Sequence, residues 1–264
     1  MIEALTRIDL AGVAGHFALV LLRAGGLALF CPIFGSEILP ARVRLAVALA
    51  LTAAMLPIVP RPDAVPSGAD AWIVVALREL SVGFGLGMAA RALLAGIEAA
   101  AGLVAGQTGF NLAAMVDPLS GDQNQAPLVF QNLLATALFL AADLHHLFLR
   151  ALRDSYDLVP LDLAPPHAAG MQSAVMLLGT RLLGVAVRLA TPALVVTVAV
   201  DLVLVLVGRA VPQMQLFSVG YPVKMAAGIV AMAILVSATG AAIGWIGRAF
   251  ASDAATLLAA CAGS

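Results

Sequence analysis

The sequence predicts an all-α integral membrane protein with about six hydrophobic segments. Hydrophobic residues make up 62% of its 264 positions and charged residues only 11%, whereas soluble domains are about 45–50% apolar. The apolar segments are continuous and lack the two-residue alternation of transmembrane β-strands. Both observations favour helices that cross or line a membrane, with lipid as a partner.

Six apolar segments are long enough to be candidate helices. They run over residues 10–34, 43–59, 71–106, 128–149, 171–209 and 223–246. The first is too long for the apolar region of a cleavable signal peptide, so we expect it to remain as a spanning segment. Loops rich in Pro and Gly separate the segments, at residues 35–42, 60–70, 106–125, 150–170 and 210–222.

The third and fifth segments far exceed the roughly 20 residues that cross a bilayer core of about 30 Å. We expect each either to tilt and protrude or to break, and at least one to be kinked. The break points on offer are the glycines between Gly83 and Gly87 and the Thr191-Pro192 pair. Small residues spaced four apart also predict close helix packing, at Gly83/Gly87, Gly102/Gly106 and Gly240/Gly244.

Charge decides little about partners or orientation. The formal net charge is −1, which gives no reason to expect nucleic acid as a partner. Basic residues at the segment ends are nearly balanced between the two sides if all six segments cross, so the positive-inside rule does not set the orientation. The two cysteines, Cys31 and Cys261, form neither a disulfide framework nor a metal-binding spacing.

Ionisable residues inside the apolar segments are the first candidates for chemistry. They are Arg23, Arg78, Glu79, Arg91, Glu98, Asp143, Arg181, Arg188 and Asp201. Such groups are costly in lipid, so the favoured interpretation is pairing between helices. The alternative is an ion-coupled secondary transporter that uses intramembrane carboxylates such as Glu98, Asp143 or Asp201. We expect Arg23 and Arg78 to lie near segment ends, with their side chains reaching the interface.

No catalytic or cofactor motif is present. Asp143 and His146 are three residues apart, which on one helix face could ligate a metal or relay protons, but no further ligand completes a site, and a polar packing contact is favoured. Nucleophile elbows, zinc-protease motifs, phosphate loops and dinucleotide fingerprints do not occur. We therefore expect no catalytic residue, no metal, no cofactor and no enzyme activity.

Residues 106–125 form a polar segment between long apolar segments. Gly106 and Gly109 permit unusual backbone angles and Asp117-Pro118 favours a turn, while apolar side chains are embedded among neutral polar ones. Non-helical backbone at membrane depth must lie in protein or line a water-filled cavity. We expect this segment to fold back into a pore or vestibule rather than to form a simple exposed loop.

Four blocks of sequence resemble the FliR family of flagellar and type III secretion export-gate proteins. They extend over nearly the whole chain and comprise Pro32–Gly35 with Leu39–Arg44, Gly106–Phe110 with Val116–Pro118, Leu138–Leu140 with His145 and Val159-Pro160, and Leu189–Pro192 with Arg209–Lys224. The last block is the most specific. Two positions depart from the family, which usually has Asn-Gly-His near Asp143 and Asn where Asp201 stands. The flagellar branch is favoured over the virulence branch, although no single residue decides it.

The resemblance implies a single export-gate domain over residues 1–264, in which long kinked hairpins resemble a fusion of FliP-like and FliQ-like helices. The FliQ-like hairpin would be residues 171–249. It further implies a non-enzymatic subunit of the flagellar protein export channel, in the bacterial inner membrane at the flagellar basal body. Its implied partners are FliP and FliQ, with FlhB and FlhA, and unfolded flagellar export substrates in transit.

The resemblance also implies two sets of functional residues. Those of the 106–125 segment would help to close the channel: Gln107, Gly109, Phe110, Asn111, Met115, Val116, Asp117 and Pro118. Those of the remaining blocks would support assembly: Pro32, Pro40, Arg42, Pro192, Arg209, Pro212, Phe217, Gly220, Pro222 and Lys224.

Overall fold

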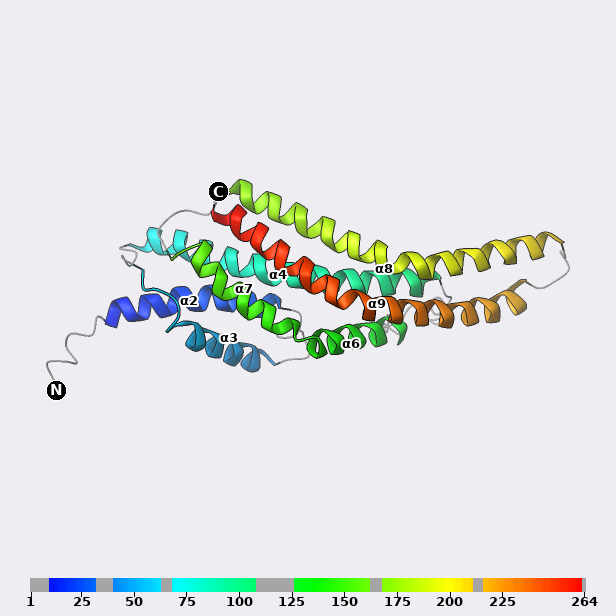
Figure 1. Cartoon of the computed structure of the whole chain (residues 1–264), viewed down its shortest axis with the longest axis horizontal. Coiled ribbons are helices and arrows are strands. Elements are labelled where there is room, and N and C mark those ends of the chain that lie inside the picture. The colour runs from blue at the N-terminus through cyan, green and yellow to red at the C-terminus, as the bar shows by residue number, and fades with distance from the viewer. Residues whose placement is uncertain are drawn as a thin grey trace. The chain divides into compact units, whose positions relative to one another are not determined.

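The protein is entirely α-helical in the part of the chain that the computed structural model describes, namely residues 10–31, 40–62, 68–107, 126–161, 168–210 and 216–262 (Figure 1). The helices in these ranges are α2 (Leu10–Phe30), α3 (Ala41–Met55), α4 (Ala69–Gln107), α6 (Ala126–Ala141), α7 (Leu144–Leu158), α8 (Ala168–Ala210) and α9 (Leu216–Ala262). The predicted fold class is confirmed.

Not every apolar segment is long enough to cross a membrane. Four described helices are: α2, α4, α8 and α9, or five spans if α6 and α7 form one broken span. Helix α3 has 15 residues, fewer than the roughly 20 that a crossing needs. The orientation argument from six crossings therefore does not apply.

The chain divides into two compact units. Unit 1 contains residues 1–91, 144–178 and 248–264, and unit 2 contains residues 92–143 and 179–247. The long helices α4, α8 and α9 each contribute residues to both units.

In unit 1, α2 and α4 pack closely at glycines. A Cβ on Gly83 would collide with the carbonyl oxygen of Arg23, and one on Gly87 would lie 2.8 Å from the Phe30 Cβ and 3.0 Å from the Leu27 oxygen. The Phe30 and Phe84 rings meet edge to face, with centroids 4.6 Å apart. The Gly83/Gly87 prediction is thus confirmed, because missing side chains permit the close approach. At Gly102, Gly106, Gly240 and Gly244 an added Cβ would meet nothing within 4 Å among the described residues.

Helix α7, also in unit 1, corrects two expectations. The predicted fourth segment, 128–149, is not one helix, because the chain breaks after Ala141 and Asp143 adopts a left-handed φ of 53°. The predicted loop 150–170 is helical up to Leu158. Phe148, Leu152 and Tyr156 are buried at four-residue spacing, whereas Arg153 and Asp157 are exposed. This amphipathic pattern buries one face of a helix but lowers the overall hydrophobicity.

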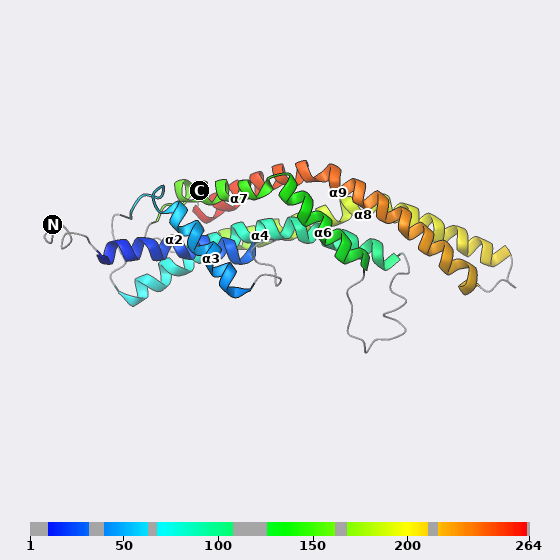
Figure 2. The ribbon, with the colours of Figure 1, turned by 90° about the horizontal axis from the view of Figure 1, so that it is seen from below.

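In unit 2, α8 and α9 lie side by side as an antiparallel hairpin (Figures 1 and 2). The amide of Gln131 on α6 donates a hydrogen bond of 2.6 Å to the Thr239 hydroxyl on α9. Gly96 of α4 packs against α8, since a Cβ there would lie 2.6 Å from the Val185 Cβ. Both long helices are unbroken. Pro192 lies inside α8, and Figure 1 shows a bend near the middle of that helix, as an internal proline favours.

Candidate functional site

The segment predicted to close a channel lies almost wholly outside the described residues. Helix α4 ends at Gln107, whose side chain is exposed, and α6 begins at Ala126. Gly109, Phe110, Asn111, Met115, Val116, Asp117 and Pro118 lie between them, outside the described ranges. Their predicted role stays a prediction.

The predicted assembly residues fall at helix ends and in the hairpin of unit 2. The Pro40 carbonyl accepts the backbone N–H groups of Val43 at 2.9 Å and Arg44 at 3.2 Å, so Pro40 starts α3. Gly220 is buried, and a Cβ there would lie 4.0 Å from a methyl carbon of Leu204. Arg42, Pro192, Arg209 and Pro222 are exposed, whereas Pro32, Pro212 and the side chain of Phe217 lie outside the described part.

Unit 1 contains a fully buried ion pair between α2 and α4. Arg23 and Glu79 are both 0% exposed. The Arg23 Nε–H donates to Glu79 Oε2 at 2.7 Å and Nη2 donates to Oε1 at 3.0 Å. This is the bidentate geometry in which a guanidinium binds a carboxylate most strongly.

The same guanidinium also binds the C-terminal end of α7. Its Nη1 donates to the Ser155 carbonyl at 2.8 Å and hydroxyl at 3.2 Å, and its Nη2 donates to the Val159 carbonyl at 2.9 Å. The last carbonyls of a helix lack partners inside the helix and carry partial negative charge. Arg23 therefore joins three helices, and its charge stabilises the end of one of them.

Two further contacts complete this cluster. The Arg23 guanidinium lies 4.3 Å from the centroid of the Tyr156 ring, at cation–π distance. Arg78 Nη1 donates to the Pro160 carbonyl at 3.1 Å, so a second arginine binds the backbone just after α7. We call Arg23, Arg78, Glu79, Ser155, Tyr156 and Val159 the arginine cluster.

The arginine cluster decides between two expectations from the sequence. Pairing between helices is confirmed for Arg23 and Glu79. The expectation that Arg23 and Arg78 reach the interface was wrong, because they are only 0% and 6% exposed. Arg and Glu in neighbouring apolar segments signalled a pair, whereas no sequence signal indicated that the pair would bind α7.

In unit 2, Asp201 of α8 pairs with Lys224 of α9. Their charged atoms are 3.0 Å apart, and both side chains are 34% exposed. The carboxylate in which this chain departs from the family pattern thus has a partner within the same hairpin. Glu98 is half-buried on α4, and Arg91 is exposed.

The predicted helix-face pair of Asp143 and His146 was wrong. Asp143 has φ 53° and precedes α7, which begins at Leu144. A residue in the left-handed conformation ends a helix, so the two side chains do not share one helix face. The His145 and His146 rings lie with centroids 4.2 Å apart.

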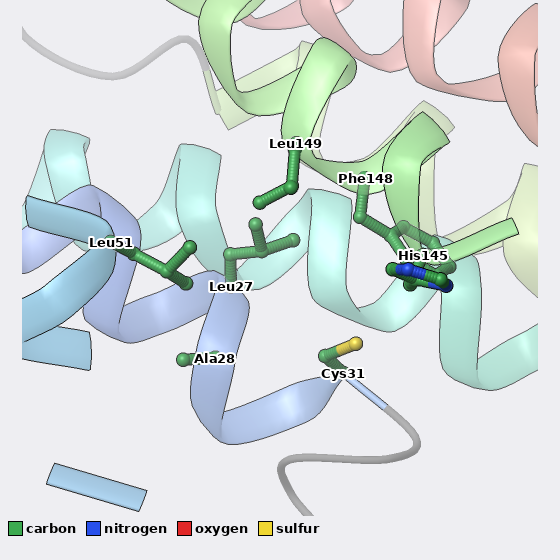
Figure 3. Close-up of a pocket in the computed structure, with 7 residues that line it drawn as sticks. All are labelled: Leu27, Ala28, Cys31, Leu51, His145, Phe148 and Leu149. Carbon is green, nitrogen blue, oxygen red and sulfur yellow. The ribbon is translucent and has the colours of Figure 1, made fainter. Parts of the chain in front are cut away.

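Unit 1 also contains an apolar cavity of about 120 Å³ that the sequence did not predict. Figure 3 shows residues of α2, α3 and α7 around it. They are Leu27, Ala28, Cys31, Leu51, His145, Phe148 and Leu149. Nδ1 of His145 is buried without a hydrogen-bond partner among the described residues. A cavity with so few polar groups is suited to apolar atoms rather than to water.

The fold and these contacts define a helical membrane protein whose buried polar groups, in the described ranges, hold helices together. Comparison with known proteins agrees, because the chain belongs to the family of bacterial export proteins, family 1, which matches residues 14–246. The resemblance to FliR proteins is confirmed.

Similar curated proteins share one printed name. The flagellar biosynthetic protein FliR of Caulobacter vibrioides is 29% identical over 232 residues, which cover 88% of this chain and 91% of that protein. The FliR of Bacillus subtilis is 28% identical over 225 residues, covering 84% and 86%. The FliR of Escherichia coli K12 is 28% identical over 215 residues, covering 81% and 82%.

Proposed function

We propose that this component of the flagellar export apparatus is a structural and gating subunit of the protein export channel. In this proposal it assembles with FliP and FliQ into the conduit for unfolded flagellar proteins, and FlhB and FlhA complete the gate. The apparatus would lie in the bacterial inner membrane at the flagellar basal body. The observation that carries the proposal is the export-family match over residues 14–246.

The exposed surface of the long hairpin supports assembly with other subunits. Helices α8 and α9 have 43 and 47 residues, or about 64 and 70 Å at 1.5 Å per residue, against a bilayer core of about 30 Å. Their apolar windows are only 17% and 22% buried, compared with 61% for α4. Lipid can cover only part of such a length, so partner subunits would cover the rest. We infer that this hairpin is the FliQ-like part, residues 171–249, of one export-gate domain.

The 106–125 segment is proposed to help close the conduit. It connects α4 to α6, which both contribute to unit 2. Phe110, Met115 and Val116 would provide the seal, and Gly109 and Asp117-Pro118 the fold-back. Sealing needs apolar contact without chemistry. The transporter alternative is not favoured, since the Asp201 carboxylate is bound by Lys224.

Deletion of residues 110–117 tests this role. We expect the assembled complex to become permeable to small solutes, because the sealing side chains are lost while α4 and α6 are retained. Solute efflux from vesicles that contain the complex measures the change.

Alanine at residues 122–125 is the matched control, since it leaves all three sealing residues in place and should keep the complex closed. Unchanged permeability together with normal export in the deletion variant would count against a closing role. A variant that fails to co-purify with its partners would instead report on assembly.

A further inference from the structure

Arg188 of α8 and Trp245 of α9 form a stacked pair within unit 2. The guanidinium carbon lies 4.9 Å from the centroid of the indole ring. Arg188 is exposed, and no carboxylate among the described residues pairs with it. A guanidinium stacked by its face keeps the N–H groups of its edge for a planar or tetrahedral anion. The pair therefore offers a fixed positive charge to an anion.

An open cavity of about 300 Å³ adjoins this pair. Besides Arg188 and Trp245 it is lined by Leu189 and by three alanines of α9, namely Ala238, Ala241 and Ala242. One part of the cavity is cationic, while its floor is apolar and low. This combination suits a ligand with an anionic head and a hydrocarbon chain better than it suits a small hydrophilic anion.

The sequence around the pair places it at the depth of lipid headgroups. Residues 189–208 of α8 contain one charge, Asp201, which Lys224 neutralises, and residues 225–244 of α9 contain none. Each stretch has about 20 residues and a helical length of about 30 Å, which matches a bilayer core. Arg188 and Trp245 each flank one end of these stretches, where arginine and tryptophan commonly meet the interface.

We propose that the Arg188–Trp245 cavity binds an anionic phospholipid, with the phosphate on the Arg188 guanidinium and an acyl chain along the alanine floor. The weakly buried apolar surface of α8 and α9 would continue the path of that chain. This site is independent of the proposed channel closure, because it uses only residues of the hairpin in unit 2.

Tryptophan fluorescence tests the proposal directly, since Trp72 and Trp245 are the two tryptophans of the chain. The full-length W72F variant, which keeps only Trp245, is reconstituted in phosphatidylcholine vesicles that contain a minor fraction of brominated phosphatidylglycerol or brominated phosphatidylcholine. We expect the anionic lipid to quench Trp245 about fivefold more effectively, as one arginine near an anionic lipid allows. R188Q should abolish this preference and R188K should retain part of it.

R209Q is the matched control, because Arg209 is an exposed arginine in the last turn of the same helix. It should leave the preference unchanged. Equal quenching by the two brominated lipids would overturn the proposal, as would a Trp245 that neither lipid quenches, which would indicate that protein covers it. Loss of the preference on addition of inorganic phosphate would assign the cavity to a free anion instead.

Discussion

Arg23 shows how a charge is accommodated in the interior of an apolar protein. Its five N–H groups have five acceptors: two Glu79 oxygens, two Ser155 oxygens and the Val159 carbonyl. A buried charge is tolerated only when it is paired and its remaining hydrogen-bonding capacity is satisfied. The pair therefore contributes mainly by fixing how α2, α4 and α7 meet, and the cost appears when one partner is lost.

Removal of one partner should be much worse than removal of both. We expect R23M to lower the free energy of unfolding by about 3–5 kcal/mol, because Glu79 is then buried without a counter-charge. The double variant R23M/E79M should recover much of this loss. A deficit of about 1–3 kcal/mol should remain for the unpaired α7 carbonyls. Unfolding in detergent, followed by circular dichroism, measures all three proteins.

The half-exposed Asp201–Lys224 pair provides the comparison. D201N should change the free energy of unfolding by at most about 1 kcal/mol, because solvent screens an exposed pair and already solvates its partner. An R23M protein as stable as D201N would contradict the structural role of the arginine cluster.

At the scale of the helices, α2 and α4 approach each other through glycine. The Gly83 position faces the Arg23 backbone so closely that no side chain fits, whereas an added Cβ at Gly85 meets nothing within 4 Å. The same crossing brings the Arg23 and Glu79 side chains together. Close backbone approach and ion pairing are thus two consequences of one helix contact.

Alanine substitutions separate these two glycines. G83A should lower the free energy of unfolding by about 1–3 kcal/mol, since it overpacks the crossing. G85A should raise it by up to about 1 kcal/mol, because alanine is the better helix former and the space is open. The same detergent unfolding assay compares them. Equal effects of the two substitutions would show that the helices do not cross at Gly83.

The helices that continuous hydrophobicity specifies could be predicted from the sequence. Residues 71–106 and 171–209 were expected, and α4 and α8 are Ala69–Gln107 and Ala168–Ala210. Helix α7 was missed beyond Leu149 because its apolar residues occupy only one face. Helix α9 continues past the predicted end at residue 246 because Phe250, Leu257 and Leu258 bury one face of a polar-looking segment.

The candidate site was predictable only in part, for a reason that concerns the whole molecule. Arg23 and Ser155 are 132 positions apart in the chain, and no local pattern reports a contact at that separation. The cavity beside Leu51 and His145 likewise depends on three helices that meet in space. Composition and motifs, by contrast, already indicated a membrane protein of the export family.

For the whole molecule, the weakly buried hairpin is the feature that most needs other subunits. Two helices longer than about 60 Å cannot be covered by lipid alone, and little of their apolar surface is buried within the chain. We therefore expect the chain to be stable mainly as part of a larger assembly. This expectation is the central claim of the proposed function.

Co-purification in detergent with FliP and FliQ, followed by mass measurement of the intact complex, tests that claim most directly. The proposed function predicts one complex of defined mass that contains all three proteins. A chain that elutes as a single monodisperse species without FliP and FliQ would contradict it.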